Sequence, residues 1–309
     1  MHTVIGIIFI LLTNSTTINF SRFFKAECRI DNALRLLSSV TFYSTHAIMF
    51  ISFWINTNNT KYFLDQLQHI YDELKDKNEI AIYEKYGYFG KRLTIILIVL
   101  STCTAFGNSI ILCLPYILDI VMPKNESYGI YIMEIMTKYF IVSEKYYYLI
   151  FTYLNISCSA GIIAYVATTT MFISFFKHIC GMFEIASYRI EQVMAIELLL
   201  DINTKNEILI YKKLIYAVDI HRKAMEFAKY CLNKLEGSML VFLIATVLCL
   251  SFNLFRIFHI ESPTEKVEEV LLHFTAVAFI MVALFVPNNI GQEITDHSNS
   301  VYVTSYNVS

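Results

Sequence analysis

Long uncharged runs of apolar residues constrain this chain more than any other feature. Five of them are long enough to cross a bilayer: residues 36–55, 93–118, 146–176, 237–255 and 270–292. A helix needs about 20 apolar residues to cross a hydrocarbon core of about 30 Å. A charged side chain at the bilayer centre costs about 2.5–3.5 kcal/mol. The sequence therefore predicts an all-α, polytopic membrane helical bundle with long helical extensions.

The N-terminus supplies a further apolar stretch. Val4–Leu12 is apolar, and the polar run Thr13–Thr17 follows it. This length also suits the apolar core of a signal peptide, but no basic segment precedes it. We therefore favour a first span over residues 3–20, which gives about six spans, and keep a cleaved signal peptide as the alternative.

Composition agrees with a membrane protein and excludes other classes. The chain is 56% hydrophobic and 16% charged, with a mean hydropathy of +0.52, whereas soluble domains carry about 25% charged residues. A formal charge of −2 gives no reason to expect a nucleic-acid partner. The seven cysteines form no CxxC pair, so we expect neither a metal site nor a disulfide framework from their spacing.

Two polar stretches between the spans are also predicted to be helical, because apolar residues recur in them at helical spacing. The first stripe is Phe63, Leu67, Ile70, Tyr71 and Leu74; the second is Ile208, Tyr211, Ile215 and Val218. We expect both to be extensions of the spans that pack on one another outside the bilayer. The larger region, residues 177–235, is predicted to be cytosolic, and residues 1–309 to form a single transmembrane receptor domain.

Loop charges favour a cytosolic N-terminus, because that orientation places most of the lysines and arginines inside. The sequon Asn125-Glu126-Ser127 then lies outside, which makes Asn125 a candidate glycosylation site. A second sequon, Asn58-Asn59-Thr60, lies inside in the same arrangement, so the sequons alone do not decide the orientation.

No enzyme is predicted, because the chain contains no HExxH, GxSxG, P-loop or dinucleotide motif. Aromatic and mildly polar residues in the outer halves of two spans suit a small, mostly apolar ligand instead. The candidate ligand-binding residues are Phe42, Tyr43, His46, Tyr147, Phe151 and Asn155. The alternative for Tyr146–Tyr148 is the interfacial aromatic belt of an ordinary span. We expect no cofactor and no metal.

Several segments resemble the insect odorant receptor family. They are His178–Phe183 running into Tyr188–Glu191, His221–Leu235 before the span at 237–255, Gly291-Gln292 with Asp296, Ser298 and Tyr306, and the helical segment Tyr62–Gly90. Each segment is degenerate by itself, but their order and spacing match the family along essentially the whole chain.

The resemblance implies a seven-helix bundle with a cytosolic N-terminus, in the plasma membrane of an olfactory sensory neuron. It also implies an odorant-binding subunit of a heteromeric odorant-gated cation channel, whose partners are a small volatile ligand, an odorant co-receptor subunit and membrane lipid. The chain departs from the family where apolar sequence begins at Val4 and where it ends at Ser309. We therefore expect it to be incomplete at the C-terminus, with Glu293–Ser309 continuing the sixth helix.

Three other classes fit less well. A gustatory receptor shares the architecture and remains the nearest alternative. A G-protein-coupled receptor should carry a DRY-like triplet and NPxxY, whereas this chain has Asp201-Ile202-Asn203 and Pro287-Asn288-Asn289. A small-solute transporter should show paired broken helices, and apart from Pro115 and Pro287 the two halves show no correspondence.

Overall fold

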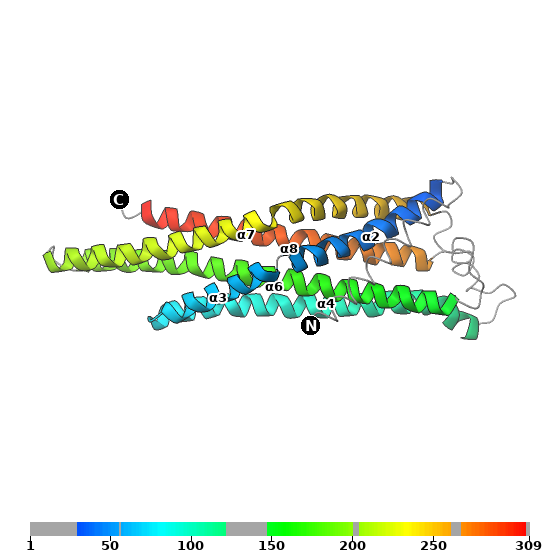
Figure 1. Cartoon of the computed structure of the whole chain (residues 1–309), viewed down its shortest axis with the longest axis horizontal. Helices are drawn as coiled ribbons and strands as arrows, with labels where there is room; N and C mark the ends of the chain where they lie inside the picture. Colours follow the sequence, from blue (N-terminus) through cyan, green and yellow to red (C-terminus); the bar gives the residue numbers. More distant parts are fainter. Residues whose placement is uncertain (1–29, 56, 122–146, 200–203, 261–266, 307–309) are drawn as a thin grey trace. The chain divides into compact units, whose positions relative to one another are not determined.

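The computed structural model describes residues 30–55, 57–121, 147–199, 204–260 and 267–306, and within them every regular element is a helix (Figure 1). The helices are α2 (Ile30–Ile55), α3 (Thr57–Glu73), α4 (Lys77–Val121), α6 (Tyr147–Leu199), α7 (Thr204–His259) and α8 (Val267–Tyr306). The predicted all-α class is confirmed. The predicted span at residues 3–20 and the sequon at Asn125 lie outside the described residues.

Four of the described helices are long and apolar enough to cross a membrane: α4, α6, α7 and α8. Only 11% of the apolar window of α4 and 22% of those of α7 and α8 are buried within the chain. Large side chains such as Ile98, Phe106 and Leu243 are accordingly exposed, which is the arrangement expected of helices solvated by lipid. The segment predicted as a span at residues 36–55 lies within α2, and its crossing of the membrane remains a prediction.

The chain divides into two compact units, and all of the described helices except α3 contribute to both. Unit 1 comprises residues 1–53, 97–168 and 238–284, and unit 2 comprises residues 54–96, 169–237 and 285–309. Within unit 1, Phe50 of α2, Ile162 of α6 and Cys249 of α7 are buried. A hydrogen bond of 2.8 Å from the Ser52 hydroxyl to the Ser238 hydroxyl joins α2 to α7.

Unit 2 is built around the second half of α6, whose Ile179, Met182 and Ile185 are fully buried. Helix α4 approaches α6 closely at Gly181, where an added Cβ would lie 3.4 Å from the Cβ of Tyr86. Of the first predicted stripe, Phe63, Leu67, Ile70 and Leu74 are buried, and this part of the pattern is confirmed.

The second predicted stripe is wrong as a packed face. Ile208, Tyr211, Ile215 and Val218 are between 49% and 68% exposed. The buried face of α7 mixes small and large residues instead: Ala217 and Ala224 are inaccessible to solvent, and Ile220 and Phe227 are also buried. The physical reason is that alanines let two helix backbones approach closely, so the inward face of α7 is not its most hydrophobic one.

A break divides the segment that the sequence predicts as helical between Tyr62 and Gly90. Helix α3 ends at Glu73 and α4 begins at Lys77. The Asp76 carboxylate accepts a hydrogen bond of 2.9 Å from the backbone N–H of Asn78, as an N-cap residue does. The segment therefore folds as two helices with a cap between them.

A bidentate ion pair between Arg189 and Glu79 holds α4 against α6 in unit 2. Nε of Arg189 lies 2.7 Å from Oε1 of Glu79, and Nη2 lies 2.8 Å from Oε2. Nη1 of Arg189 donates to the backbone carbonyl of Tyr216 on α7 at 2.8 Å. One guanidinium therefore links three helices.

The predicted continuation of the last helix beyond Gln292 is confirmed as far as the described residues reach. Helix α8 passes Pro287 without ending and continues to Tyr306. Helix α6 likewise continues beyond its apolar run to Leu199. The cytosolic location of these extensions remains a prediction.

Candidate ligand-binding site

His46 is a buried imidazole on α2 with one nitrogen engaged and the other without a hydrogen-bond partner among the described residues. The residue is 3% exposed. Its Nδ1 lies 2.8 Å from the backbone carbonyl oxygen of Phe42. Because a carbonyl only accepts, Nδ1 carries the proton and Nε2 of the neutral ring is a hydrogen-bond acceptor. Among the described residues, no hydrogen-bond partner reaches this buried Nε2.

Aromatic rings from three helices surround His46. Its ring centroid lies 4.6 Å from that of Phe42 on α2, 6.1 Å from that of Tyr165 on α6 and 6.2 Å from that of Phe279 on α8. The Phe279 ring is nearly parallel to the imidazole, at 12°. These distances are typical of interacting aromatic pairs, so the imidazole has apolar walls on several sides.

The rings also contact one another. Tyr165 packs edge-on against Phe279 at 5.3 Å and stacks on Phe242 of α7 at 6.1 Å. Tyr43 packs edge-on against Phe42 at 5.7 Å. We call His46, Phe42, Tyr165, Phe242 and Phe279 the aromatic cluster. It draws on α2, α6, α7 and α8, all within unit 1.

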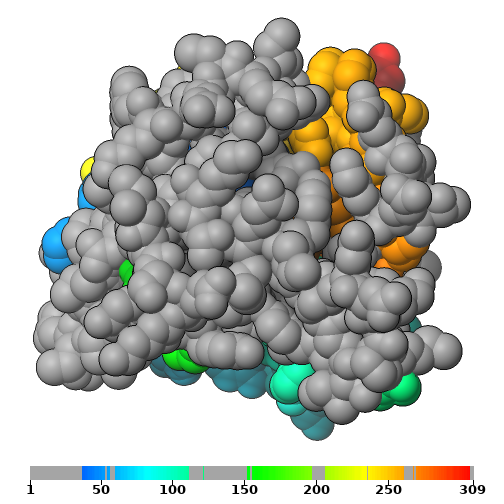
Figure 2. Space-filling view, turned by 90° about the vertical axis from the view of Figure 1, so that its right-hand side faces the viewer, coloured from blue at the N-terminus to red at the C-terminus, as the bar shows by residue number. Residues whose placement is uncertain are grey.

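A second group of buried polar side chains lies in unit 1. The Asn253 carbonyl oxygen accepts from the Ser38 hydroxyl at 3.1 Å and lies 2.8 Å from Nδ1 of His273. The Arg256 guanidinium pairs with the Glu269 carboxylate. The end of α7 and the beginning of α8, which carry this pair, adjoin on the face shown in Figure 2, in gold and orange. Buried polar groups that satisfy one another in this way fix the packing of α2, α7 and α8.

The six candidate residues from the sequence fall into three groups. Phe42 contacts both Tyr43 and His46 on α2. The Asn155 amide oxygen accepts from the Ser109 hydroxyl at 3.4 Å, which joins α6 to α4. Tyr147 and Phe151 belong to α6, but their side chains lie outside the described residues.

Sequence reasoning missed Tyr165, Phe242 and Phe279 in the cluster, and Asn253, Glu269 and His273 in the polar group. The three aromatic residues lie within uncharged apolar runs, where no contrast between polar and apolar residues marks the inward face. A detectable signal was present for the polar group, since Asn253 and His273 are isolated polar residues in apolar runs and such residues usually face the bundle interior.

A family model described as "7tm Odorant receptor" matches residues 29–309. The fold is similar to that of the insect olfactory receptor OR5 from Machilis hrabei in complex with eugenol, with a TM-score of 0.71 and 13% identity over 98% of this chain and 78% of that one. It is also similar to another structure of the same receptor, with a TM-score of 0.68 and 14% identity over 96% and 71% of the two chains.

No curated protein matches the chain in sequence. The family match nevertheless covers nearly the whole chain, including every described helix. The fold that it implies agrees with the described residues, which form an all-helical bundle with four helices long and apolar enough to cross a membrane. The chain belongs to the seven-transmembrane odorant receptor family.

Proposed function

We propose that this chain is the odorant-binding subunit of a heteromeric odorant-gated cation channel in the plasma membrane of an olfactory sensory neuron. Family membership supports the receptor role. The channel, the co-receptor partner and the cellular location follow from the resemblance to the family.

The observation that carries the ligand assignment is the Nε2 of His46 within the aromatic cluster, for which the described part of the chain offers no hydrogen-bond partner. A buried polar atom without a hydrogen bond costs about 1–3 kcal/mol. A ligand that donates a hydrogen bond to this atom recovers that energy. Since Nε2 accepts, the preferred ligand carries an O–H or N–H donor rather than an ether or ester oxygen alone.

The side chains around His46 indicate the size and polarity of the rest of the ligand. Rings of Phe42, Tyr165 and Phe279 offer apolar faces and no charge, so the ligand is a small aromatic or aliphatic molecule with one polar group. A solved receptor of similar fold is in complex with eugenol, which is a small phenol. Tyr43 and Asn155 are further candidate contacts, and Tyr147 and Phe151 complete the proposed set.

The test pairs each phenol with its methyl ether, because the ether keeps the shape and loses the donor. Cells expressing the chain with an odorant co-receptor are recorded for cation current against both compounds. We expect the phenol to act at about fivefold lower concentration than the ether, because a hydrogen bond contributes about 1 kcal/mol. His46→Phe should abolish this preference, since phenylalanine keeps an aromatic ring and has no acceptor.

A matched control is His259→Phe, a histidine of the same unit whose ring stacks on Phe255 at 3.9 Å. This variant should keep the preference for the phenol. If His46→Phe responds to both compounds with the wild-type ratio, His46 does not contact the ligand. If no current is obtained with any co-receptor, while the protein reaches the cell surface, the channel role is wrong.

A further inference from the structure

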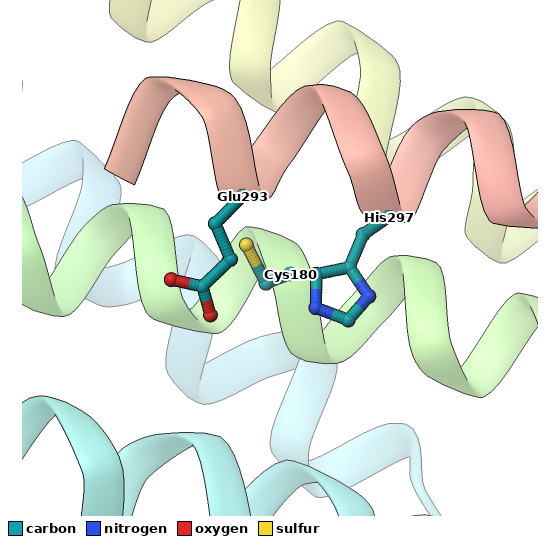
Figure 3. Close-up of side chains that lie close together, drawn as sticks. All are labelled: Cys180, Glu293 and His297. Carbon is teal, nitrogen blue, oxygen red and sulfur yellow. The ribbon is translucent and has the colours of Figure 1, made fainter. Parts of the chain in front are cut away.

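Two pairs of residues of the kinds that bind metal ions face each other in unit 2, one pair on α6 and the other on α8. Cys180 and Glu184 are four residues apart on α6, and Glu293 and His297 are four residues apart on α8. Residues at this spacing lie on the same face of a helix. The ligand atoms of Cys180, Glu293 and His297 all lie within 4.8 Å of one another, and Figure 3 shows the three side chains gathered between the two helices.

The surroundings of His297 determine which nitrogen is available. Oε2 of Glu184 lies 3.3 Å from Nδ1 of His297, so Nδ1 carries the proton and Nε2 keeps its lone pair. The Tyr86 hydroxyl lies 3.0 Å from Nε2. This hydroxyl donates to the Nε2 lone pair, so an ion that binds Nε2 takes its place. A carboxylate on the other imidazole nitrogen is the usual second shell of a protein-bound metal ion.

Lys177 is the one positive group that the described contacts place at this cluster. Its Nζ lies 2.7 Å from Oε1 of Glu293 and 2.5 Å from Oε2. A carboxylate has about four lone-pair positions, so Glu293 can keep the ammonium on one side and a metal ion on the other. Cys180 is a neutral thiol without a metal ion, and zinc binding releases its proton to solvent. The resulting thiolate with Glu184 and Glu293 supplies three negative charges, which exceed the single charge of Lys177.

The donor set selects the metal. A thiolate, an imidazole and a carboxylate together suit zinc, which takes four ligands in a tetrahedral arrangement. Calcium and magnesium prefer oxygen ligands alone. Cys180 is fully buried, whereas the side chains of Glu293 and His297 remain 25% and 21% exposed, so an ion can enter from their side.

We infer that Cys180, Glu293 and His297 bind a zinc ion, with Glu184 holding His297 in the ligating tautomer and the fourth position open to water. The spacing of ligands along the sequence does not reveal this site, because its two halves are separated by more than a hundred residues. The inference does not rest on the proposed odorant response. A bound ion would fasten α6 to α8 within unit 2.

The test uses the full chain purified in detergent and freed of metal, with Co²⁺ as a coloured substitute for Zn²⁺. We expect one equivalent of Co²⁺ to give a thiolate charge-transfer band and tetrahedral d–d bands, and one equivalent of Zn²⁺ to remove them. Cys180→Ala should lose the charge-transfer band, and His297→Ala should bind at least tenfold more weakly. Glu184→Gln should weaken binding about 10- to 100-fold, the range for second-shell partners.

Cys231→Ser is the matched control, since Cys231 is another buried cysteine of unit 2. It should keep the wild-type spectrum. A wild-type protein that gives no thiolate band would overturn the inference, as would a band that persists in Cys180→Ala. The wild-type titration decides the question even if Cys180→Ala does not fold, and Glu184→Gln gives a second, conservative variant.

Discussion

The ion pair between Arg189 and Glu79 gives a sharp test of how unit 2 is held together. Glu79 is 7% exposed, and the Arg189 side chain is 19% exposed. Arg189→Met removes both charged hydrogen bonds to Glu79 and leaves a carboxylate buried without its partner. Such single replacements cost about 3–5 kcal/mol. Because the arginine is partly exposed, we expect the free energy of unfolding to fall by about 3 kcal/mol, the lower end of this range.

The double variant Glu79→Met with Arg189→Met separates the attraction between the two charges from the cost of burying them. Replacing both members of a buried pair by apolar residues is often neutral, so the double variant should lie within about 1 kcal/mol of wild type. With about 2–4 °C per kcal/mol for a structure of this size, Arg189→Met should lower the melting temperature by about 6–12 °C. The double variant should recover most of that loss.

The assay is the melting temperature of the purified protein in lipid nanodiscs, followed by the loss of the monodisperse gel-filtration peak. Arg222→Met is the control, because Arg222 is 68% exposed and pairs with Asp219 on the same helix at 3.2 Å. Exposed pairs contribute about 0–1 kcal/mol, so this variant should melt close to wild type. A double variant as unstable as Arg189→Met, or an Arg189→Met that melts like Arg222→Met, would refute the reasoning.

Two further predictions concern the stability of unit 2. Gly181→Ala should melt close to wild type in the same assay, because the added methyl meets Tyr86 at ordinary contact distance and alanine favours helix over glycine by about 1 kcal/mol. Gly181→Leu should melt well below wild type, because its larger side chain does not fit between α4 and α6. If Gly181→Leu melted at the wild-type temperature, the close packing at this position would be contradicted. Burial lowers the pKa of His221 in the folded protein. The unfolded chain, whose histidine pKa is about 6.5, therefore takes up a proton more readily than the folded protein, and the free energy of unfolding falls as the pH drops below about 6.5. His221→Phe, which keeps the ring contact with Phe183 at 5.5 Å, should therefore lose less stability than wild type between pH 7.5 and 5.5, and parallel losses would contradict this.

The elements of the fold were predictable because the chain's apolar runs are long. A run without charge must be a helix in lipid, since backbone groups have no other partner there, and α4, α6, α7 and α8 follow from this argument alone. His46 was also within reach, as a lone titratable residue in the apolar run of α2. Its neighbours Tyr165 and Phe279 were not, because lipid and protein interior are equally apolar and hydrophobicity does not mark the inward face.

The failure on α7 has a different cause, because this segment lies outside the predicted spans. The stripe Ile208, Tyr211, Ile215 and Val218 is the most hydrophobic face of that segment, yet it is exposed within this chain. The inward face carries Ala217 and Ala224, which contribute little to a hydrophobic pattern. Close approach of backbones, rather than apolar area, decides which face packs. Sequence periodicity therefore located this helix correctly and oriented it wrongly.

His46 and His297 differ in the residues that surround the imidazole nitrogen available to a ligand. In both, Nδ1 faces an acceptor, the Phe42 carbonyl for His46 and the Glu184 carboxylate for His297, so Nε2 holds the lone pair. Around His46 the walls are neutral rings, which favour an organic molecule with a hydrogen-bond donor. Around His297 stand a thiol and carboxylates, which favour a cation. The same imidazole tautomer thus serves different chemistry, because the charge of its neighbours selects the ligand.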